Sequence, residues 1–162
     1  MQLDVEQQIA EIVVFLRRIG LTVRLRALTG DTFFPGLAIR GGALVIDRSK
    51  LAYPGDLLHE AGHMAVMTAA DRMRCEGEAG TDGGAEMAAI AWSYAAALEI
   101  GLEPAVVFHA DGYKSGGSAI LENFAAGRYI GVPLLQWFEI TTERRNDTGR
   151  AVYPKMSRWL RE

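Results

Sequence analysis

The segment His59-Glu60-Ala61-Gly62-His63 is the feature that most limits what this chain of 162 residues can fold into. The chain has three histidines, and two of them, in this segment, are four residues apart. At about 100° per residue, such positions lie on one face of a helix, one turn from each other. Both imidazoles can then reach one metal ion at about 2.0–2.1 Å. Glu60 lies to the side of the pair, where it cannot readily be a third ligand but can contact and deprotonate a water bound to the metal.

The residues around this motif predict a buried helix over about 56–73. Leu57, Leu58, Met64 and Val66 are apolar, as a helix in the interior requires. Asp56 lies near the start, where a carboxylate suits both the cap and the helix dipole. The alternative is a helix whose histidines are merely packed or capping. Because two buried imidazoles and a Glu are costly without a partner, we favour metal binding.

A catalytic zinc site takes three protein ligands and keeps a fourth position open. Six downstream residues are candidates for the third ligand: Glu76, Glu78, Asp82, Glu86, His109 and Asp111. We favour Glu86, because it opens a helix predicted over about 85–99, just after a Gly-rich loop at 76–84. Small residues on its face, Ala89 and Ser93, would let two helices pack closely around the ion. Asp82 is the alternative ligand if the loop folds over the metal, and His109 is the alternative if the site is all-histidine. Glu86 could also be only a favourable acidic residue in the first turn of its helix.

Hydrophobic periodicity elsewhere predicts one α+β domain over residues 1–162, with a small sheet near the N-terminus. We expect a helix over 4–19, then a strand over 21–28 that keeps Arg24 and Arg26 on its wet face. Gly41-Gly42 separates 33–40 from 43–47, as in a hairpin. Three more helices are expected: 119–126 after a Ser118 cap, 134–140 after Pro133, and one that begins at Pro154.

Charge and composition exclude several classes of protein. Lys and Arg number 17 and Asp and Glu 20, a net charge of −3, so the chain offers no basic footprint for nucleic acid. A basic cluster near the C-terminus is expected to be solvated: Arg144, Arg145, Arg150, Lys155, Arg158 and Arg161. The lone Cys75 cannot form an internal disulfide. No signal peptide and no run of about 18 apolar residues is present, so we expect a cytoplasmic protein without membrane contact, of unknown oligomeric state.

The motif with Glu86 downstream resembles the zincin metallopeptidases, in particular the gluzincin branch. The order of helix, strand, apolar strand, motif helix, loop and Glu-bearing helix is similar to the compact ImmA/IrrE-type bacterial metallopeptidases. This resemblance covers about residues 5–100. It implies His59, His63 and Glu86 as zinc ligands and Glu60 as general base. It also implies that the strand Ala43–Asp47 is a sheet edge, able to pair with an extended substrate.

The chain departs from these families in three places. No third histidine of the metzincin kind follows the motif. Ile90 stands four residues after Glu86, where some gluzincins carry an acidic residue that orients a ligand. Residues 101–162, a helical extension, match no catalytic module.

Hydrolysis of an amide also needs a donor for the developing oxyanion. His109 and Tyr113 are the favoured candidates, with Tyr94 as a third. His109 and Tyr113 belong to a polar segment that continues through Lys114-Ser115 and could close over a cleft or form an ordinary surface turn. Phe33-Phe34 could line a substrate groove or belong to the core.

The function predicted from these residues is zinc-dependent hydrolysis of a peptide or protein substrate. One alternative is a catalytically silent zincin-like fold that binds a partner, which the unassigned C-terminal third would serve. The other is hydrolysis of a non-peptide amide at the same site.

Overall fold

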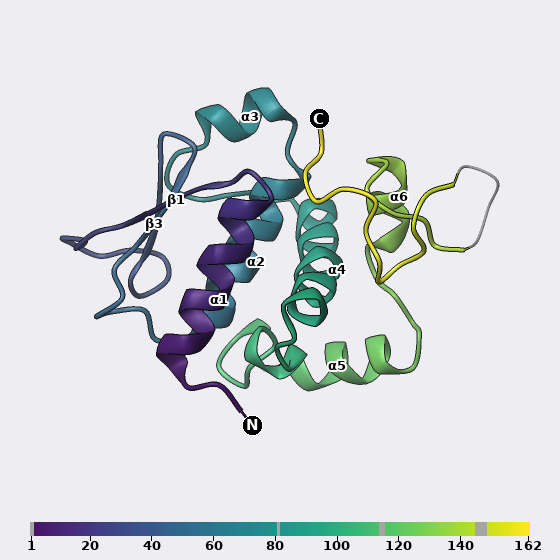
Figure 1. Ribbon diagram of the computed structural model, residues 1–162, viewed down its shortest axis with the longest axis horizontal. Helices are drawn as coiled ribbons and strands as arrows, with labels where there is room; N and C mark the ends of the chain where they lie inside the picture. The colour runs from purple at the N-terminus through teal and green to yellow at the C-terminus, as the bar shows by residue number, and fades with distance from the viewer. Residues whose placement is uncertain (1, 81, 114–115, 145–148) are drawn as a thin grey trace.

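The structure, a computed structural model, describes residues 2–80, 82–113, 116–144 and 149–162. Lys114, Ser115 and Arg145, named above, lie outside these ranges. The described chain is α+β, with six α-helices and a mixed three-stranded sheet. Figure 1 shows the sheet to one side of the central helices and α6 (Val132–Trp137) to the other, with the C-terminal residues running from beside α6 back to the central helices. None of the described helices is both long and apolar enough to span a bilayer.

The first helix, α1 (Val5–Arg18), forms where the apolar spacing predicts it. Asp4 caps it through a capping box, in which its carboxylate accepts from the Gln7 backbone and the Gln7 side chain accepts from the Asp4 backbone. Its apolar face is buried, with Ile12 and Leu16 fully enclosed. The capped helix therefore supplies one wall of the core.

The sheet contains β1 (Thr22–Leu25), β2 (Leu37–Arg40) and β3 (Ala43–Ile46). The predicted hairpin is confirmed: β2 and β3 are antiparallel across Gly41-Gly42. Both glycines have positive φ, +54° and +75°, as a two-residue hairpin turn requires. On β1, Arg24 is exposed as expected.

The expected position of β3 at a sheet edge is wrong. The strand order is β1-β3-β2, so β3 is central, parallel to β1 and antiparallel to β2. All four residues of β3 are buried, which agrees with a central strand. The strand edge that lies beside the cleft described below belongs to β2, whose Leu37, Ala38 and Ile39 line it.

The motif lies on α2 (Pro54–Val66), and all 13 residues of this helix are buried. A helix that is apolar on most of its surface is stable only inside the protein. Its polar residues occupy one stripe, because positions 56, 59, 60 and 63 follow the helical repeat. The fold thus holds Asp56, His59, Glu60 and His63 on one face of its most enclosed helix.

The single helix predicted over 56–73 is divided in two. α2 ends at Val66, and α3 (Ala69–Arg74) begins after Thr68, whose side chain accepts a hydrogen bond from Asp71 N. Met67 between them has an extended backbone (φ −70°, ψ 154°). The Thr68 cap competes with continuation of the helix, which is why the periodicity alone is misleading here.

The helix α4 (Gly83–Ile100) makes the most extensive helix contact with α2. It begins two residues earlier than predicted. Its buried residues are mostly alanines, so the two backbones approach closely. At the crossing, a Cβ on Gly62 would lie 2.9 Å from the Ala89 carbonyl oxygen and 3.2 Å from the Trp92 ring.

We therefore expect Gly62→Ala to lower the free energy of unfolding by about 1–2 kcal/mol, because overpacking outweighs the better helix propensity of Ala. Urea denaturation measures the change. Gly83→Ala is the matched control, because a Cβ there meets nothing within 4 Å; its effect should stay within about 1 kcal/mol and be neutral or stabilising. Equal losses in both variants would contradict the packing argument.

Residues after α4 form a short 3-10 turn, Pro104–Val106, then α5 (Gly117–Ala125) and α6. Gly116 rather than Ser118 occupies the cap position of α5, and α6 follows Gly131 with Pro133 in its first turn, but ends three residues earlier than expected. The helix predicted after Pro154 is wrong. Its backbone amides bond elsewhere: Ser157 N donates to the Ile140 carbonyl and Arg161 N to the Ala65 carbonyl.

The C-terminal segment instead supports the two central helices. The buried Tyr153 hydroxyl donates to the Ala91 carbonyl, and the Trp92 indole donates to the Trp159 carbonyl. The bond from Arg161 N to Ala65 satisfies a carbonyl at the end of α2. The C-terminal residues are therefore part of the same core as the motif helix.

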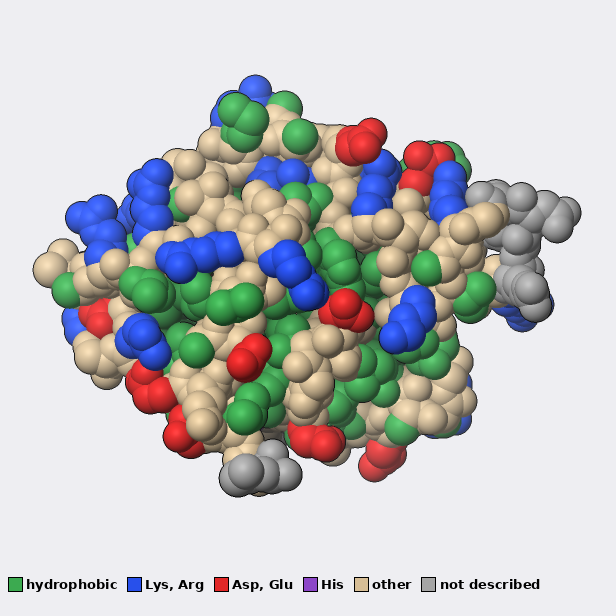
Figure 2. All heavy atoms as spheres, in the orientation of Figure 1, with side chains coloured by type: hydrophobic (Ala, Val, Ile, Leu, Met, Phe, Trp, Pro, Cys, Tyr) green, Lys and Arg blue, Asp and Glu red, His purple; other side chains and the backbone are tan. Residues whose placement is uncertain are grey.

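Part of the basic cluster is ion-paired, whereas Arg144 and Lys155 are exposed, as expected for solvated charges. Arg150 and Arg158 both pair with Glu139, at 2.7 and 3.9 Å. The Arg161 guanidinium lies 4.1 Å from the centre of the Phe138 ring. On the face drawn in Figure 2, basic and acidic side chains are interspersed.

Candidate metal centre

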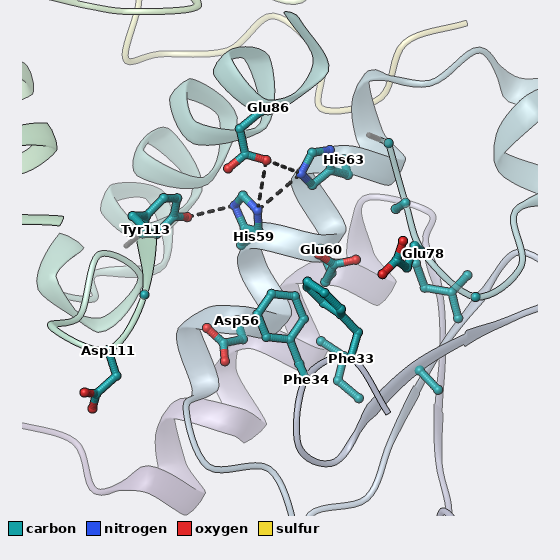
Figure 3. A pocket seen from close by; sticks show the side chains of 17 residues that line it. Phe33, Phe34, Asp56, His59, Glu60, His63, Glu78, Glu86, Asp111 and Tyr113 are labelled. Carbon is teal, nitrogen blue, oxygen red and sulfur yellow. Dashed lines mark hydrogen bonds and ion pairs between the residues drawn. The ribbon is translucent and has the colours of Figure 1, made fainter. Parts of the chain in front are cut away.

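Three side-chain atoms from two helices converge on one point (Figure 3). His59 Nε2 and His63 Nε2, one turn apart on α2, are 3.2 Å from each other. Glu86 Oε2, from the first turns of α4, lies 2.8 Å from His63 Nε2 and 3.4 Å from His59 Nε2. Such a set of nitrogen and carboxylate donors could hold a metal ion.

Two carboxylates, Glu60 and Glu86, could complete the set. Ligand atoms of His59, Glu60 and His63 all lie within 4.8 Å of one another, so this buried group is itself a possible metal site. Glu86 is closer, however, and Figure 3 shows it turned between the two rings, whereas the Glu60 carboxylate is turned into the cleft. The shorter distances favour Glu86 as the ligand.

The two carboxyl groups also differ in acidity. Hydrogen bonds with His59 and His63 hold the pKa of Glu86 far below its usual range, so it is anionic as a ligand must be. Burial raises the pKa of Glu60, whose residue is only 9% exposed. The lowered pKa suits Glu86 to remain an anion, and the raised pKa suits Glu60 to accept a proton.

The start of α4 explains why Glu86 and not Asp82 reaches the histidines. Asp82 is the N-cap residue, and its Oδ1 accepts a hydrogen bond of 2.8 Å from Ala85 N. Its carboxylate is thus engaged in the cap. Glu86 follows one turn later, on the side of α4 that faces α2.

Tyr113 contacts the centre through His59. Its hydroxyl lies 2.7 Å from His59 Nδ1, the nitrogen that does not face the convergence point. The Tyr113 backbone has a φ of +54°, a left-handed conformation that is strained for a bulky residue. Burial raises the pKa of the phenol well above its usual range, so it stays protonated. This contact suits a positioning role for Tyr113; a role as oxyanion donor remains a prediction.

His109 does not reach the convergence point. Its Nε2 is 2.8 Å from Asp56 Oδ1, and its ring stacks on Tyr53 with centroids 4.0 Å apart. The Tyr53 hydroxyl in turn donates to Asp111. These contacts fasten the segment that carries Tyr113 to the first turn of α2. Neither the third-ligand nor the oxyanion role predicted for His109 is supported by this placement.

Sequence reasoning named Asp56 only as a cap and did not connect Tyr53 with the site. The signal for Asp56 was its helical register with the motif, since it precedes Glu60 by four residues. For Tyr53, 58 residues from its partner Asp111, local sequence contains no comparable signal.

Tyr94 stays away from the centre and packs on Phe108 and Phe124. His63 Nδ1 is buried, with no hydrogen-bond partner in the described residues. Gly80 covers this nitrogen closely: a Cβ on Gly80 would lie 2.7 Å from it. The loop before α4 therefore needs glycine at this position to pass over the ring.

A cleft of about 530 Å³ opens onto these residues. One wall is aromatic, formed by Phe33 and Phe34, whose rings meet edge to face with centroids 4.9 Å apart. Phe34 is half-buried, so this pair serves the groove rather than the deep core. Gly77–Gly80 of the loop, the Leu37–Ile39 edge of β2 and Tyr113 complete the lining.

Comparison of the chain with protein-family models, with curated proteins and with solved structures finds no match. Inferences about function therefore rest on the geometry of the site and on the motif.

Proposed function

We propose that this chain is a zinc-dependent peptidase of zincin type, in which His59, His63 and Glu86 hold the ion and Glu60 is the general base. The observation that carries the proposal is the convergence of two imidazole nitrogens and one carboxylate oxygen at 2.8–3.4 Å from one another.

Zinc fits these distances. Ligands about 2.0–2.1 Å from a tetrahedral ion lie about 3.3 Å from each other, close to the spacings found here. Two His and one Glu form a known ligand set of catalytic zinc. With Nε2 at the metal, His59 would carry its proton on Nδ1 and donate a hydrogen bond to the Tyr113 hydroxyl oxygen.

The residues around the ion divide the work of hydrolysis between them. A bound zinc ion would acidify a water molecule and polarise the substrate carbonyl. Glu60, with its carboxylate turned into the cleft, accepts the proton of the attacking water and can pass it to the departing amine. Burial raises the pKa of Glu60 toward neutral pH, where a carboxyl group can both accept a proton and return it.

A peptide substrate suits the shape of the cleft. Its apolar wall can take a side chain. The β2 edge is already partly paired, because the Ile39 carbonyl accepts from Gly77 N and Leu37 N donates to the Phe34 carbonyl, so the fit to a peptide rests on the cleft rather than on strand addition. A non-peptide amide could be cleaved by the same groups, and comparing amide substrates of both kinds separates the two. The alternative of a catalytically silent binding module was suggested by the unassigned C-terminal third. Residues of this part of the chain, however, hydrogen-bond to α4 and so stabilise the core around the motif.

The direct test is to measure zinc stoichiometry after loading the purified protein and to follow cleavage of a defined peptide mixture by mass spectrometry. One zinc per chain and metal-dependent cleavage are expected. Binding without turnover of any peptide would favour the silent module.

We expect Tyr113→Phe to weaken zinc binding by about 10- to 100-fold, because loss of a hydrogen bond to a metal-bound histidine typically has an effect of this size. Competition with a chromogenic zinc chelator measures it. Tyr94→Phe is the matched control, since the Tyr94 hydroxyl has no hydrogen bond within the described residues. Equal zinc affinities of wild type and Tyr113→Phe would show that this contact does not support the site.

A further inference from the structure

The cleft has one sign of charge. Its described lining contains five carboxylates and no Lys or Arg: Asp56, Glu60, Glu78, Glu86 and Asp111. Such single-sign lining contrasts with the mixed charges on the surface in Figure 2. A divalent ion offsets only part of it, so the cleft keeps a negative potential that attracts cations.

Three of the five carboxylates already have partners. Glu86 is bonded to the histidines, Asp56 to His109, and Asp111 to the Tyr53 hydroxyl. The carboxylates of Glu60 and Glu78 have neither a hydrogen bond nor an ion pair within the described chain.

Glu60 is nine-tenths buried, so its lack of a partner is the more unusual. In Figure 3, the carboxylates of Glu60 and Glu78 turn toward one another across the cleft. Two unpaired carboxylates that face each other form a place where a positive group is stabilised. The acidic lining therefore points to a ligand that brings its own cation.

The aromatic wall indicates which kind of cation. Phe33 is 73% exposed and lines the same cleft as Glu78. A Lys or Arg side chain combines an apolar stem, which packs along a ring, with a charged end that seeks a carboxylate. A small inorganic cation would leave the aromatic wall without a function.

We propose that the cleft selects peptides that carry a Lys or Arg side chain, with its stem against Phe33 and its charged end at Glu78. This inference rests on the proposed peptidase function for the identity of the substrate. Glu60 keeps its separate task as proton acceptor, and Glu78 is the residue that determines specificity.

The test uses zinc-loaded full-length protein and fluorescent hexapeptides that carry one Lys, Gln or Glu at each successive position in a Gly-Ala-Phe background. Binding is followed by fluorescence anisotropy and cleavage by mass spectrometry. We expect the best Lys peptide to bind about fivefold more tightly than its Gln counterpart, the upper end of what an ion pair with an exposed carboxylate such as Glu78 contributes. The Glu counterpart should bind most weakly, and the difference should shrink as salt is raised.

Two variants assign the preference to residues. Glu78→Gln should reduce the Lys-over-Gln ratio to about twofold, whereas Glu11→Gln, the same change at an exposed site on α1, should leave it unaltered. Phe33→Ala should weaken binding of the Lys peptide about threefold, through lost stem packing and cation–π attraction. Trp137→Ala is its control, because Trp137 is 80% exposed and lies outside the cleft lining.

The outcomes separate this inference from the proposed function. Cleavage without a preference for Lys, or a preference that survives Glu78→Gln, overturns the inference and leaves the peptidase proposal intact. Lys-selective binding that Glu78→Gln abolishes, without turnover of any peptide, supports the inference and counts against the peptidase.

Discussion

Replacing Glu60 by Gln should lower the rate of peptide cleavage by about 10²- to 10⁴-fold while zinc stays bound, since this is the usual contribution of a general base. Gln has nearly the same shape and retains no proton-accepting carboxylate. The packing of α2 should be unchanged, because the Glu60 carboxylate makes no hydrogen bond or ion pair within the described residues. Initial rates on the best-cleaved peptide, at equal zinc occupancy, provide the measurement.

Glu11→Gln controls for the loss of one negative charge at a site remote from the cleft. It should cleave at the wild-type rate. If Glu60→Gln retains more than about a tenth of the wild-type activity with zinc bound, another group accepts the proton and the proposed role of Glu60 fails. If Glu60→Gln instead loses zinc, Glu60 belongs to the ligand set, as its proximity to both histidines allows.

Local sequence was sufficient wherever one short segment determines the geometry. The pair His59 and His63 could be placed on one face because the helical repeat fixes their angle. The hairpin at Gly41-Gly42 could be predicted because its two residues need positive φ. The buried status of α2 followed from its apolar composition on nearly all faces.

Properties that depend on partners distant in the chain could not be predicted in this way. The central place of β3 depends on β1, which pairs with it in parallel after a long connection. The missing last helix depends on Ile140 and Ala65, whose carbonyls take the amides of Ser157 and Arg161. Periodicity records the tendency of a segment, whereas these hydrogen bonds depend on the completed core.

The proposed third ligand falls between these two cases. Sequence favoured Glu86, but the choice over Asp82 depended on which residue begins α4. The structure has Asp82 at the N-cap, bonded to Ala85 N, and this assigns Glu86 to the turn that faces the histidines. The available signal in the sequence was an Asp just before the predicted helix, the position from which a carboxylate caps the backbone amides of the first turn.

Glu86→Ala should weaken zinc binding by more than about a hundredfold. Losing even a residue that orients a ligand typically has an effect of 10- to 100-fold, and Glu86 is proposed as a ligand itself because its Oε2 lies 2.8 and 3.4 Å from the two imidazole nitrogens. Glu86→Gln, which keeps the shape but removes the charge, should show an intermediate loss. Competition with a chromogenic chelator at fixed pH measures all three proteins.

Asp82→Asn is the matched control, because Asn also caps a helix well and so tests the alternative ligand without disturbing α4. Its zinc affinity should equal that of the wild type. Loss of zinc in Asp82→Asn with retention in Glu86→Ala would reverse the assignment of the third ligand.

The two neighbouring carboxylates are expected to differ when replaced: Glu86→Ala loses the metal, whereas Glu60→Gln keeps the metal but loses the reaction. Such a division would follow from their environments, since Glu86 is held as an anion by two imidazoles whereas Glu60 is enclosed without a partner within the described residues.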